Sequence, residues 1–264
     1  MKYYERGDYM KVDINCDYGE SYGIYKLSDN EKILKYATSL NVACGFHGGD
    51  PVVMDKTVKS ALKMGVSVGA HPGYPDLMGF GRRHIKLSPI EAKAYMKYQI
   101  GALKGFVESY GGKLQHVKPH GALYNDAAKD YELAYAIAEA VYEIDKELIF
   151  FGISNQKTIE AAKEIGLKTA NEVFADREYN DDGTLVSRSI KNSVITDKDR
   201  CIDRVIKMVK HNYVETINGK KIEIIPDTIC VHGDNEKSLE LIKNIRESLE
   251  KAGIEIISFS KRNV

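Results

Sequence analysis

Short β-prone runs alternate with amphipathic helical patterns along the whole chain. Such alternation is typical of βα units that surround a parallel sheet. The β-prone runs cover residues 11–15, 41–44, 66–70, 114–118, 148–152, 169–174, 228–232 and 254–259. Seven or eight strands in this order predict an α/β fold closed into a barrel.

Several of the intervening segments carry helix-start signals. Segments 88–91 and 28–31 each place a serine three residues before a glutamate, which is the pattern of a capping box. Pro89 and Pro51 stand at first helical positions, where a missing N–H costs nothing. The apolar stripes behind these starts predict core packing rather than a cofactor site; they comprise Met54, Val58, Ala61, Met96, Ile100, Leu103, Val107, Leu133, Ile137, Val141 and Ile144.

Two segments depart from the alternation. Residues 214–225 hold Asn218-Gly219 between two β-prone arms, which predicts a hairpin on the surface. Residues 1–9 have no apolar period, so we expect a flexible N-terminal tail there. Residues 10–264 are predicted to form a single β/α-barrel catalytic domain.

Composition limits the classes of partner. The 264 residues contain 38 Lys and Arg against 38 Asp and Glu, and this balance argues against a nucleic-acid-binding protein. The four cysteines form no CxxC pair and favour buried, reduced thiols. Neither a run of ~18 apolar residues nor a signal peptide is present, so we predict a cytoplasmic protein without membrane contacts.

Polar residues gather at the carboxyl ends of the predicted strands. In a parallel barrel these ends share one face, where ligands bind. Because side chains alternate along a strand, Asp13, Asn15 and Asp17 are expected to point together toward the barrel mouth. Three hydrogen-bond acceptors on one inward face are more than the cap of the following turn would use. We therefore favour a functional role for these residues over a capping role.

The same alternation groups polar residues on other strands. Lys118 and His120 follow the fourth strand and are interpreted as site residues, whereas His116 alone is interpreted as structural. In each of two further groups, an even number of positions separates the residues, which places them on the same side of their strand. The groups are Glu172 with Asp176, and Cys230 with His232 and Asp234.

Glycine-rich loops carry further candidates. His47 and His71 lie where backbone can approach a ligand closely. With Asp17 and His120 they form a set that could bind a divalent metal, although the sequence contains no i, i+4 histidine pair. Metal binding is therefore kept as an alternative, with Asp17, His47 and His71 as its candidates.

Arginines near the predicted mouth suggest anion binding. The loop 73–83 is rich in glycine and ends in Arg82 and Arg83, which resembles a lid that carries a fork for a carboxylate or phosphate. Arg177 follows a predicted strand end and is a third candidate. The sequence has no GxxxxGK[ST] loop, GxSxG elbow or HExxH helix, so any ATP used is expected to be held mainly by another chain.

Seven long motifs resemble one known family in the same order. They are DINCDYGE at 13–20, NVACGFH at 41–47, GAHPGYP at 69–75, GFGRR at 79–83, VKPHGALY at 117–124, EVFADR at 172–177 and ICVHGD at 229–234. Together they are similar to the LamB/YcsF family from about Met10 to the C-terminus.

The resemblance implies a distorted seven-stranded parallel barrel with a deacetylase-like shape. It also implies one subunit of an ATP-dependent 5-oxoprolinase, which opens 5-oxo-L-proline to L-glutamate while ATP becomes ADP and phosphate. Subunits B and C are the implied partners, and the bound small molecule is a lactam.

Within that function we assign candidate roles to the polar clusters. The catalytic candidates are Asp13, Asp17 and His47 as bases, with Lys118 and His120 stabilising charge on the carbonyl oxygen. The substrate-binding candidates are Asn15, Glu20, His71, Arg82, Arg83, Asp176, Arg177, His232 and Asp234, with the arginines as partners of the substrate carboxylate.

Two alternatives remain open at this stage. The first is a metal-dependent hydrolase of an amide or an N-acetyl sugar that needs no ATP and uses Asp17, His47, His71 and His120 as ligands. The second is a non-catalytic subunit that only binds the lactam.

Overall fold

The computed structural model describes residues 10–27, 31–231 and 236–262. Seven parallel strands form a closed barrel, because β1 pairs with both β2 and β9 while the other strands pair in sequence order. This confirms the predicted distorted seven-stranded β/α barrel. The barrel strands are β1 (Lys11–Tyr18), β2 (Ser39–Ala43), β3 (Ser67–His71), β4 (His116–Val117), β5 (Ile149–Ile153), β6 (Lys168–Phe174) and β9 (Thr228–Cys230).

Unequal strand lengths account for the distortion. β1 has eight residues, whereas β4 has two and β9 has three. β1 pairs with β10 (Glu255–Ile256) at its start, with β9 in its middle and with β2 at its end. The eighth predicted strand, 254–259, is thus a two-residue strand beside the barrel, and it gives way to the 3-10 helix η2 (Phe259–Lys261).

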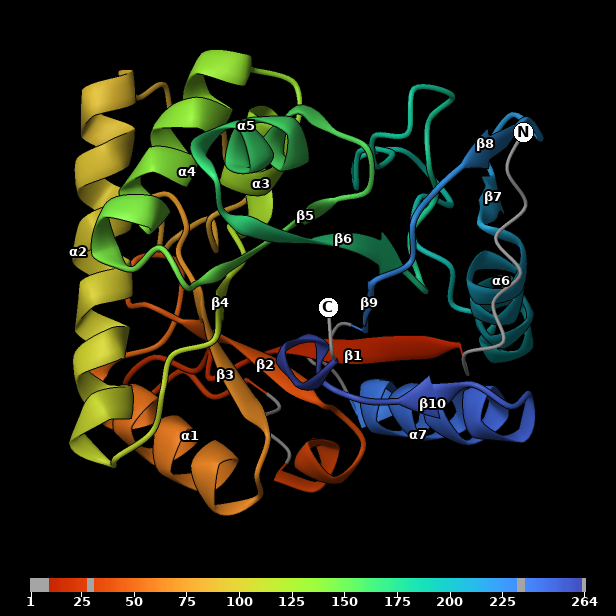
Figure 1. Ribbon diagram of the computed structural model, residues 1–264, viewed down its shortest axis with the longest axis horizontal. Helices are drawn as coiled ribbons and strands as arrows, with labels where there is room; N and C mark the ends of the chain where they lie inside the picture. The colour runs from red at the N-terminus through yellow and green to blue at the C-terminus, as the bar shows by residue number, and fades with distance from the viewer. Residues whose placement is uncertain (1–9, 28–30, 232–235, 263–264) are drawn as a thin grey trace.

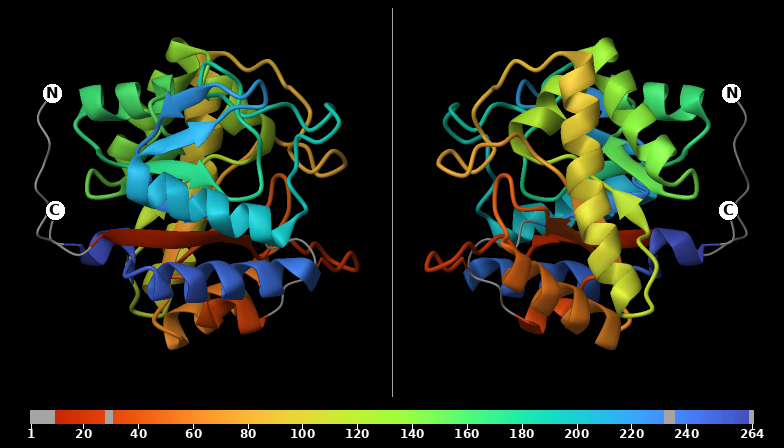
Figure 2. Two further views of the ribbon diagram at one scale, coloured as in Figure 1. Left: turned by 90° about the vertical axis from the view of Figure 1, so that its right-hand side faces the viewer. Right: turned by 90° about the vertical axis from the view of Figure 1, so that its left-hand side faces the viewer.

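Helices lie outside the barrel strands (Figure 1). α6 and α7 pack against each other on the side of the barrel that holds β1 (Figure 2). The helices are α1 (Pro51–Lys63), α2 (Pro89–Ser109), α3 (Gly121–Ala127), α4 (Tyr131–Ile144), α5 (Lys157–Ile165), α6 (Lys198–His211) and α7 (Glu236–Lys251). Within the described ranges, no helix combines the length and apolar character needed to cross a bilayer.

The predicted helix starts at 88–91 and at Pro51 are confirmed. The Ser88 side chain accepts from the Glu91 amide while the Glu91 carboxylate accepts from the Ser88 amide, so α2 begins with a complete capping box. Asp50 caps α1 by accepting from the amides of Val52 and Val53. In the third predicted start, residues 28–30 lie outside the described part of the chain, and Glu31–Lys35 form the short 3-10 helix η1.

The α2 stripe is buried as the periodicity predicts. Met96, Ile100, Leu103 and Val107 have no exposed surface and belong to the main core cluster. Full burial of one such side chain stabilises the fold by about 1.5–3 kcal/mol relative to leaving it in water. This contact holds α2 against the barrel in the neighbourhood of β3.

The predicted hairpin is also confirmed. β7 (Tyr213–Glu215) pairs antiparallel with β8 (Lys221–Glu223). Gly219 has φ 81°, a left-handed conformation that glycine adopts without a Cβ penalty. The predicted tail, residues 1–9, lies outside the described residues.

The four cysteines are free and buried, as predicted. His116 is also buried inside the barrel, where its ring stacks on Phe151 with centroids 4.0 Å apart. Its Nε2 lies 2.8 Å from Asn41 Oδ1. These packing contacts agree with the structural role expected for His116.

His116 is expected to make the fold acid-sensitive. Burial, followed by the nearby charge of Lys118, lowers the pKa of His116 to about 3, below the ordinary unfolded value of about 6.5. The unfolded chain therefore binds an extra proton below pH 6.5, and stability falls as pH drops from 6.5 toward 3. In urea unfolding, we expect His116→Gln to reduce the slope of the free energy of unfolding between pH 6 and 4 by about 1.4 kcal/mol per pH unit. An unchanged slope would contradict this assignment.

Candidate functional site

A cavity of about 460 Å³ opens at the carboxyl ends of the barrel strands. Its walls come from the ends of β1, β3 and β6, from the loop after β4 and from the loop 185–190. The position agrees with the ligand face expected of a parallel barrel. Seven residues named from the sequence line it, namely Asp17, Glu20, His71, Arg82, Lys118, His120 and Arg177.

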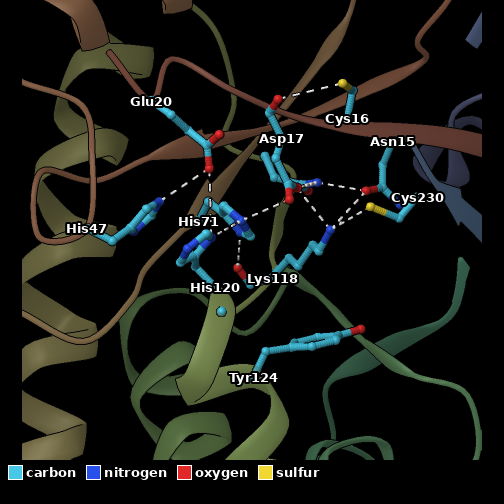
Figure 3. Close-up of polar contacts among 12 residues, drawn as sticks. Asn15, Cys16, Asp17, Glu20, His47, His71, Lys118, His120, Tyr124 and Cys230 are labelled. Atoms are coloured by element: carbon cyan, nitrogen blue, oxygen red, sulfur yellow. Dashed lines mark hydrogen bonds and ion pairs between the residues drawn. The ribbon is translucent and has the colours of Figure 1, made fainter. Parts of the chain in front are cut away.

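A buried cation lies at the base of this cavity. The Lys118 ammonium is 2.9 Å from Asp17 Oδ1 (Figure 3) and 2.9 Å from Glu172 Oε1, and its side chain is only 3% exposed. It also lies 3.3 Å from Asn15 Oδ1 and 3.2 Å from the sulfur of Cys230. One side chain after β4 thereby contacts β1, β6 and β9.

Electrostatics keeps Lys118 charged. Burial alone would lower the pKa of its ammonium, but Asp17, Cys230 and Glu172 together raise that pKa well above its usual range. The protonated amine is then a permanent positive charge at the cavity base, able to stabilise negative charge on a bound molecule.

Asp17 is the carboxylate that joins Lys118 to the histidines. Its Oδ1 accepts from Asn41 Nδ2 at 2.8 Å and from Lys118 at 2.9 Å. Its Oδ2 faces His71 Nε2 at 3.4 Å (Figure 3). Asp17 lines the cavity, so this oriented carboxylate can reach a bound molecule.

Glu172 and Tyr124 extend the polar centre. The Tyr124 hydroxyl donates to Glu172 Oε2, and burial together with Glu172 raises the pKa of that hydroxyl well above its usual range. Glu172 itself has no exposed surface. The pair fixes the second carboxylate beside Lys118 and keeps the phenol protonated.

Three imidazoles and one carboxylate form a second cluster above Asp17. The ligand atoms of Glu20, His47, His71 and His120 all lie within 4.8 Å of one another, and the four residues are buried. His47 and His120 stack with centroids 3.6 Å apart (Figure 3). Burial and the neighbouring imidazoles lower the pKa values of His47 and His120 well below the usual value, so both rings are neutral. Neutral imidazoles with a carboxylate are a donor set that suits a transition metal.

Glycines allow the loop 73–81 to close over these rings. A Cβ on Gly81 would lie 2.7 Å from His47 Cβ and 2.8 Å from His120 Cδ2. A Cβ on Gly73 would lie 2.8 Å from His47 Nδ1. Phe80, beside Gly81, has φ 54°, a strained conformation for a bulky residue, and its carbonyl oxygen is 2.9 Å from His120 Nε2. The loop geometry therefore positions the histidine cluster.

The arginines separate into two groups. Arg82 and Arg177 line the cavity, and so do two basic residues without an assigned role in the sequence analysis, Lys129 and Arg188. Arg83 does not line it, because its guanidinium pairs with Asp76 and is 66% exposed. Burial lowers the pKa of Arg177 to about 10, and the group still carries its charge at neutral pH. The cavity wall is consequently suited to anionic ligands.

Asp13 and Asn15 lie deeper in the barrel and do not line the cavity. Asp13 accepts hydrogen bonds from the hydroxyls of Thr38, Ser39 and Thr228. Asn15 donates to Thr228 and accepts from Asn41 and Lys118. Register explains the difference, because Asp17 pairs with Asn41 in the middle of β2 while Asn15 pairs with its first residue.

The remaining sequence candidates lie apart from the cavity wall. His47 is behind Glu20, with 3.6 Å between His47 Nε2 and Glu20 Oε1. Asp176 is buried but is not among the lining residues. His232 and Asp234 lie outside the described residues.

Several residues of the site carry no prediction from the sequence, and Glu20 carries a different one. Tyr124 and Glu172 both lie in recognised motifs, and the parity of Glu172 was a usable signal. The sequence predicts Glu20 as a substrate-binding residue and does not predict its contact with the histidines. Arg188 follows no strand end or motif, so the sequence held no signal for it.

Removing the buried cation is expected to destabilise the fold. In Lys118→Met, Asp17 and Glu172 lose their shared partner, and breaking a buried pair in this way costs about 3–5 kcal/mol. The double variant Lys118→Met/Glu172→Gln should recover part of that loss because one carboxylate charge is gone. Urea unfolding at pH 8 measures both. A loss below about 1 kcal/mol in the single variant would contradict the electrostatic account.

The chain is similar to known proteins over nearly its whole length. The family model described as the LamB/YcsF family matches residues 12–264. A protein of Alkaliphilus metalliredigens, named as the A subunit of 5-oxoprolinase, is 57% identical over 248 residues, which are 94% of this chain and 97% of that protein. A Campylobacter jejuni protein with the same name is 58% identical over 246 residues, 93% of this chain and 96% of that one.

A solved structure agrees with these matches. The lactam utilization protein of Thermus thermophilus superimposes with a TM-score of 0.88 at 44% identity, covering 94% of this chain and 99% of that chain. The match to the family model and the identity to these relatives lead to one conclusion: this chain belongs to the LamB/YcsF family.

Proposed function

We propose that this chain is the A subunit of an ATP-dependent 5-oxoprolinase, which cleaves the cyclic amide of 5-oxo-L-proline to give L-glutamate. The observation that carries the proposal is a cavity in which a buried ammonium–carboxylate centre faces a wall with three arginines. Relatives named as the A subunit of 5-oxoprolinase, and a neighbour named a lactam utilization protein, support the choice of substrate.

The reaction needs an external driving force. Glutamate holds its amine beside its own side-chain carboxyl, so the five-membered ring recloses with a high effective molarity. ATP hydrolysis to ADP and phosphate supplies the drive, and we assign ATP binding mainly to subunits B and C. In this scheme the partners use ATP to activate the lactam oxygen, and the barrel adds water to the carbonyl carbon. The C–N bond then breaks, and the ring nitrogen takes up a proton from the added water to become the amine of glutamate. A cytoplasmic location belongs to the same proposal.

The substrate carboxylate is assigned to the arginine wall. Arg177 is buried beside the cavity, with one guanidinium nitrogen 2.6 Å from the carbonyl oxygen of Val186. This contact orients the planar group, and a planar guanidinium can bind a carboxylate through two parallel hydrogen bonds. Arg82 is assigned as the second partner of that carboxylate.

Asp17 is assigned as the base that accepts a proton from the attacking water. Lys118 and Asn41 hold its Oδ1, which leaves Oδ2 on the side of the histidines. Lys118 is assigned to stabilise the negative charge that develops on the carbonyl oxygen. His120, which the sequence suggested for the same role, donates its ring N–H to the Phe80 carbonyl and is assigned to position the site instead.

The other candidates are assigned supporting roles. Asn15 orients Lys118, because its amide oxygen contacts the ammonium. Asp13 holds the N-terminal part of β1 in place through its three hydroxyl partners. His47, His71 and Glu20 position the top of the site. His232, Asp234 and Asp176 remain proposals as substrate-orienting residues.

Asp17→Asn tests the assigned base. The amide keeps the shape of the side chain but cannot accept the proton, so glutamate formation in the complex with subunits B and C should fall by about 10²–10⁴-fold. Asp203→Asn on α6 is the matched control, because Asp203 is exposed and pairs with Lys207 away from the cavity. The assay measures glutamate from 5-oxo-L-proline with and without ATP. Near-normal turnover in Asp17→Asn would favour a purely binding role for this subunit.

Arg177→Lys tests the carboxylate partner. Lysine keeps the charge but loses the planar fork, so KM for 5-oxo-L-proline should rise about tenfold while kcat changes less. Arg83→Lys serves as the comparison, since the guanidinium of Arg83 pairs with Asp76 outside the cavity wall. A larger rise of KM in Arg83→Lys than in Arg177→Lys would reverse the assignment.

The cluster of Glu20 and three histidines favours a second candidate function, a metal-dependent amide hydrolase. Such an enzyme would act on its amide without ATP. Hydrolysis by the isolated chain in the absence of nucleotide and partners would support it over the oxoprolinase.

A further inference from the structure

Two backbone carbonyls fix the hydrogens on two histidines of the cluster. His71 Nδ1 is 2.7 Å from the carbonyl oxygen of Lys118, and His120 Nε2 is 2.9 Å from that of Phe80. A carbonyl oxygen can only accept, so each of these nitrogens carries the hydrogen. This leaves the opposite nitrogens, His71 Nε2 and His120 Nδ1, as the ring atoms available to bind a metal ion.

These two nitrogens face each other. His71 Nε2 and His120 Nδ1 are 2.9 Å apart. Asp17 Oδ2 lies 3.4 Å from the first, and Glu20 Oε1 lies 3.8 Å from the second (Figure 3). Two ring nitrogens and two carboxylate oxygens thus converge in a buried space, and these are atom types that bind transition metals.

A single ion bound here contacts both nitrogens and a carboxylate oxygen, whereas a shared proton joins only one pair of atoms. Histidines that bind metals almost always donate their other ring N–H to a carbonyl or carboxylate, and both His71 and His120 do so here.

Ring geometry decides which histidines bind. His47 and His120 are stacked with an interplanar angle of 4° and centroids 3.6 Å apart. A metal lies close to the plane of each imidazole that binds it, and one ion cannot lie in two parallel planes at this spacing. His120 is held by the Phe80 carbonyl, whereas neither ring nitrogen of His47 has a hydrogen-bond partner among the described residues. His47 is therefore beside the ion rather than bound to it.

We propose that His71 Nε2, His120 Nδ1 and Glu20 bind one divalent transition-metal ion of the zinc class. Two histidines and one glutamate are a known donor set for catalytic zinc. Such an ion polarises a carbonyl oxygen or lowers the pKa of a bound water. Asp17 and His47 then flank the ion as proton acceptors. This site goes beyond the oxoprolinase assignment and does not depend on it.

The test measures metal binding by the full chain, without a histidine tag, ATP, lactam or partner subunits. The chain is stripped with a chelator and titrated with Co²⁺ and Zn²⁺. We expect one equivalent of Co²⁺ to bind with a visible d–d absorption, Zn²⁺ to displace it, and Zn²⁺ to raise the melting temperature. His120→Asn and Glu20→Gln should weaken binding by at least about 100-fold.

Two variants sharpen the ligand assignment. His47→Gln should keep metal affinity within a few-fold, and His211→Gln, which removes an exposed histidine on α6, should match the wild type. Absence of stoichiometric binding by the folded wild-type chain would overturn the proposal in favour of a shared proton. A loss in His47→Gln as large as in His120→Asn would overturn the ligand set. Because no turnover is measured, failure of the oxoprolinase assignment would leave this result unaffected.

Discussion

The buried Lys118 ammonium is the interaction on which the rest of the structure depends. It joins the carboxylates of Asp17 and Glu172, the amide of Asn15 and the sulfur of Cys230, and so connects three strands from inside the barrel. A charge without solvent must be paired, which fixes the positions of its partners closely. The same pairing that closes the barrel interior also orients Asp17 toward the cavity, so stability and chemistry share one set of contacts.

Polar groups inside the barrel change in character from bottom to top. At the bottom, Asp13 is satisfied by three hydroxyls and takes no part in the cavity wall. In the middle, Lys118 balances two carboxylates. At the top, the imidazoles of His47, His71 and His120 meet Glu20, with their ligand atoms within 4.8 Å of one another. The interior therefore passes from a carboxylate held by hydroxyls to a cluster of side chains of the types that bind metals, and this change coincides with the opening of the cavity.

Much of this arrangement follows from the sequence. The alternation of β1 predicted the inward side of Asp13, Asn15 and Asp17, because a strand period of two leaves no other choice when the outer face is apolar. The depth of each of these side chains within the barrel was not predictable, since it depends on the register between strands that are far apart in sequence. The contact of Lys118 with Glu172, and the alignment of His71 with His120, similarly require the closed barrel. Arg83 lies outside the cavity wall because its guanidinium pairs with Asp76, and the glycine-rich pattern of the loop did not predict that pairing.

The central claim is that lactam hydrolysis takes place at the Lys118–Asp17 centre of this chain. The most direct measurement is an experimental structure of the complex with subunits B and C, bound to 5-oxo-L-proline and a non-hydrolysable ATP analogue. The account predicts the lactam in the cavity of about 460 Å³, with its carbonyl beside Lys118 and Asp17 and its carboxylate on Arg177. A lactam bound wholly within a partner subunit, remote from Lys118, would contradict it.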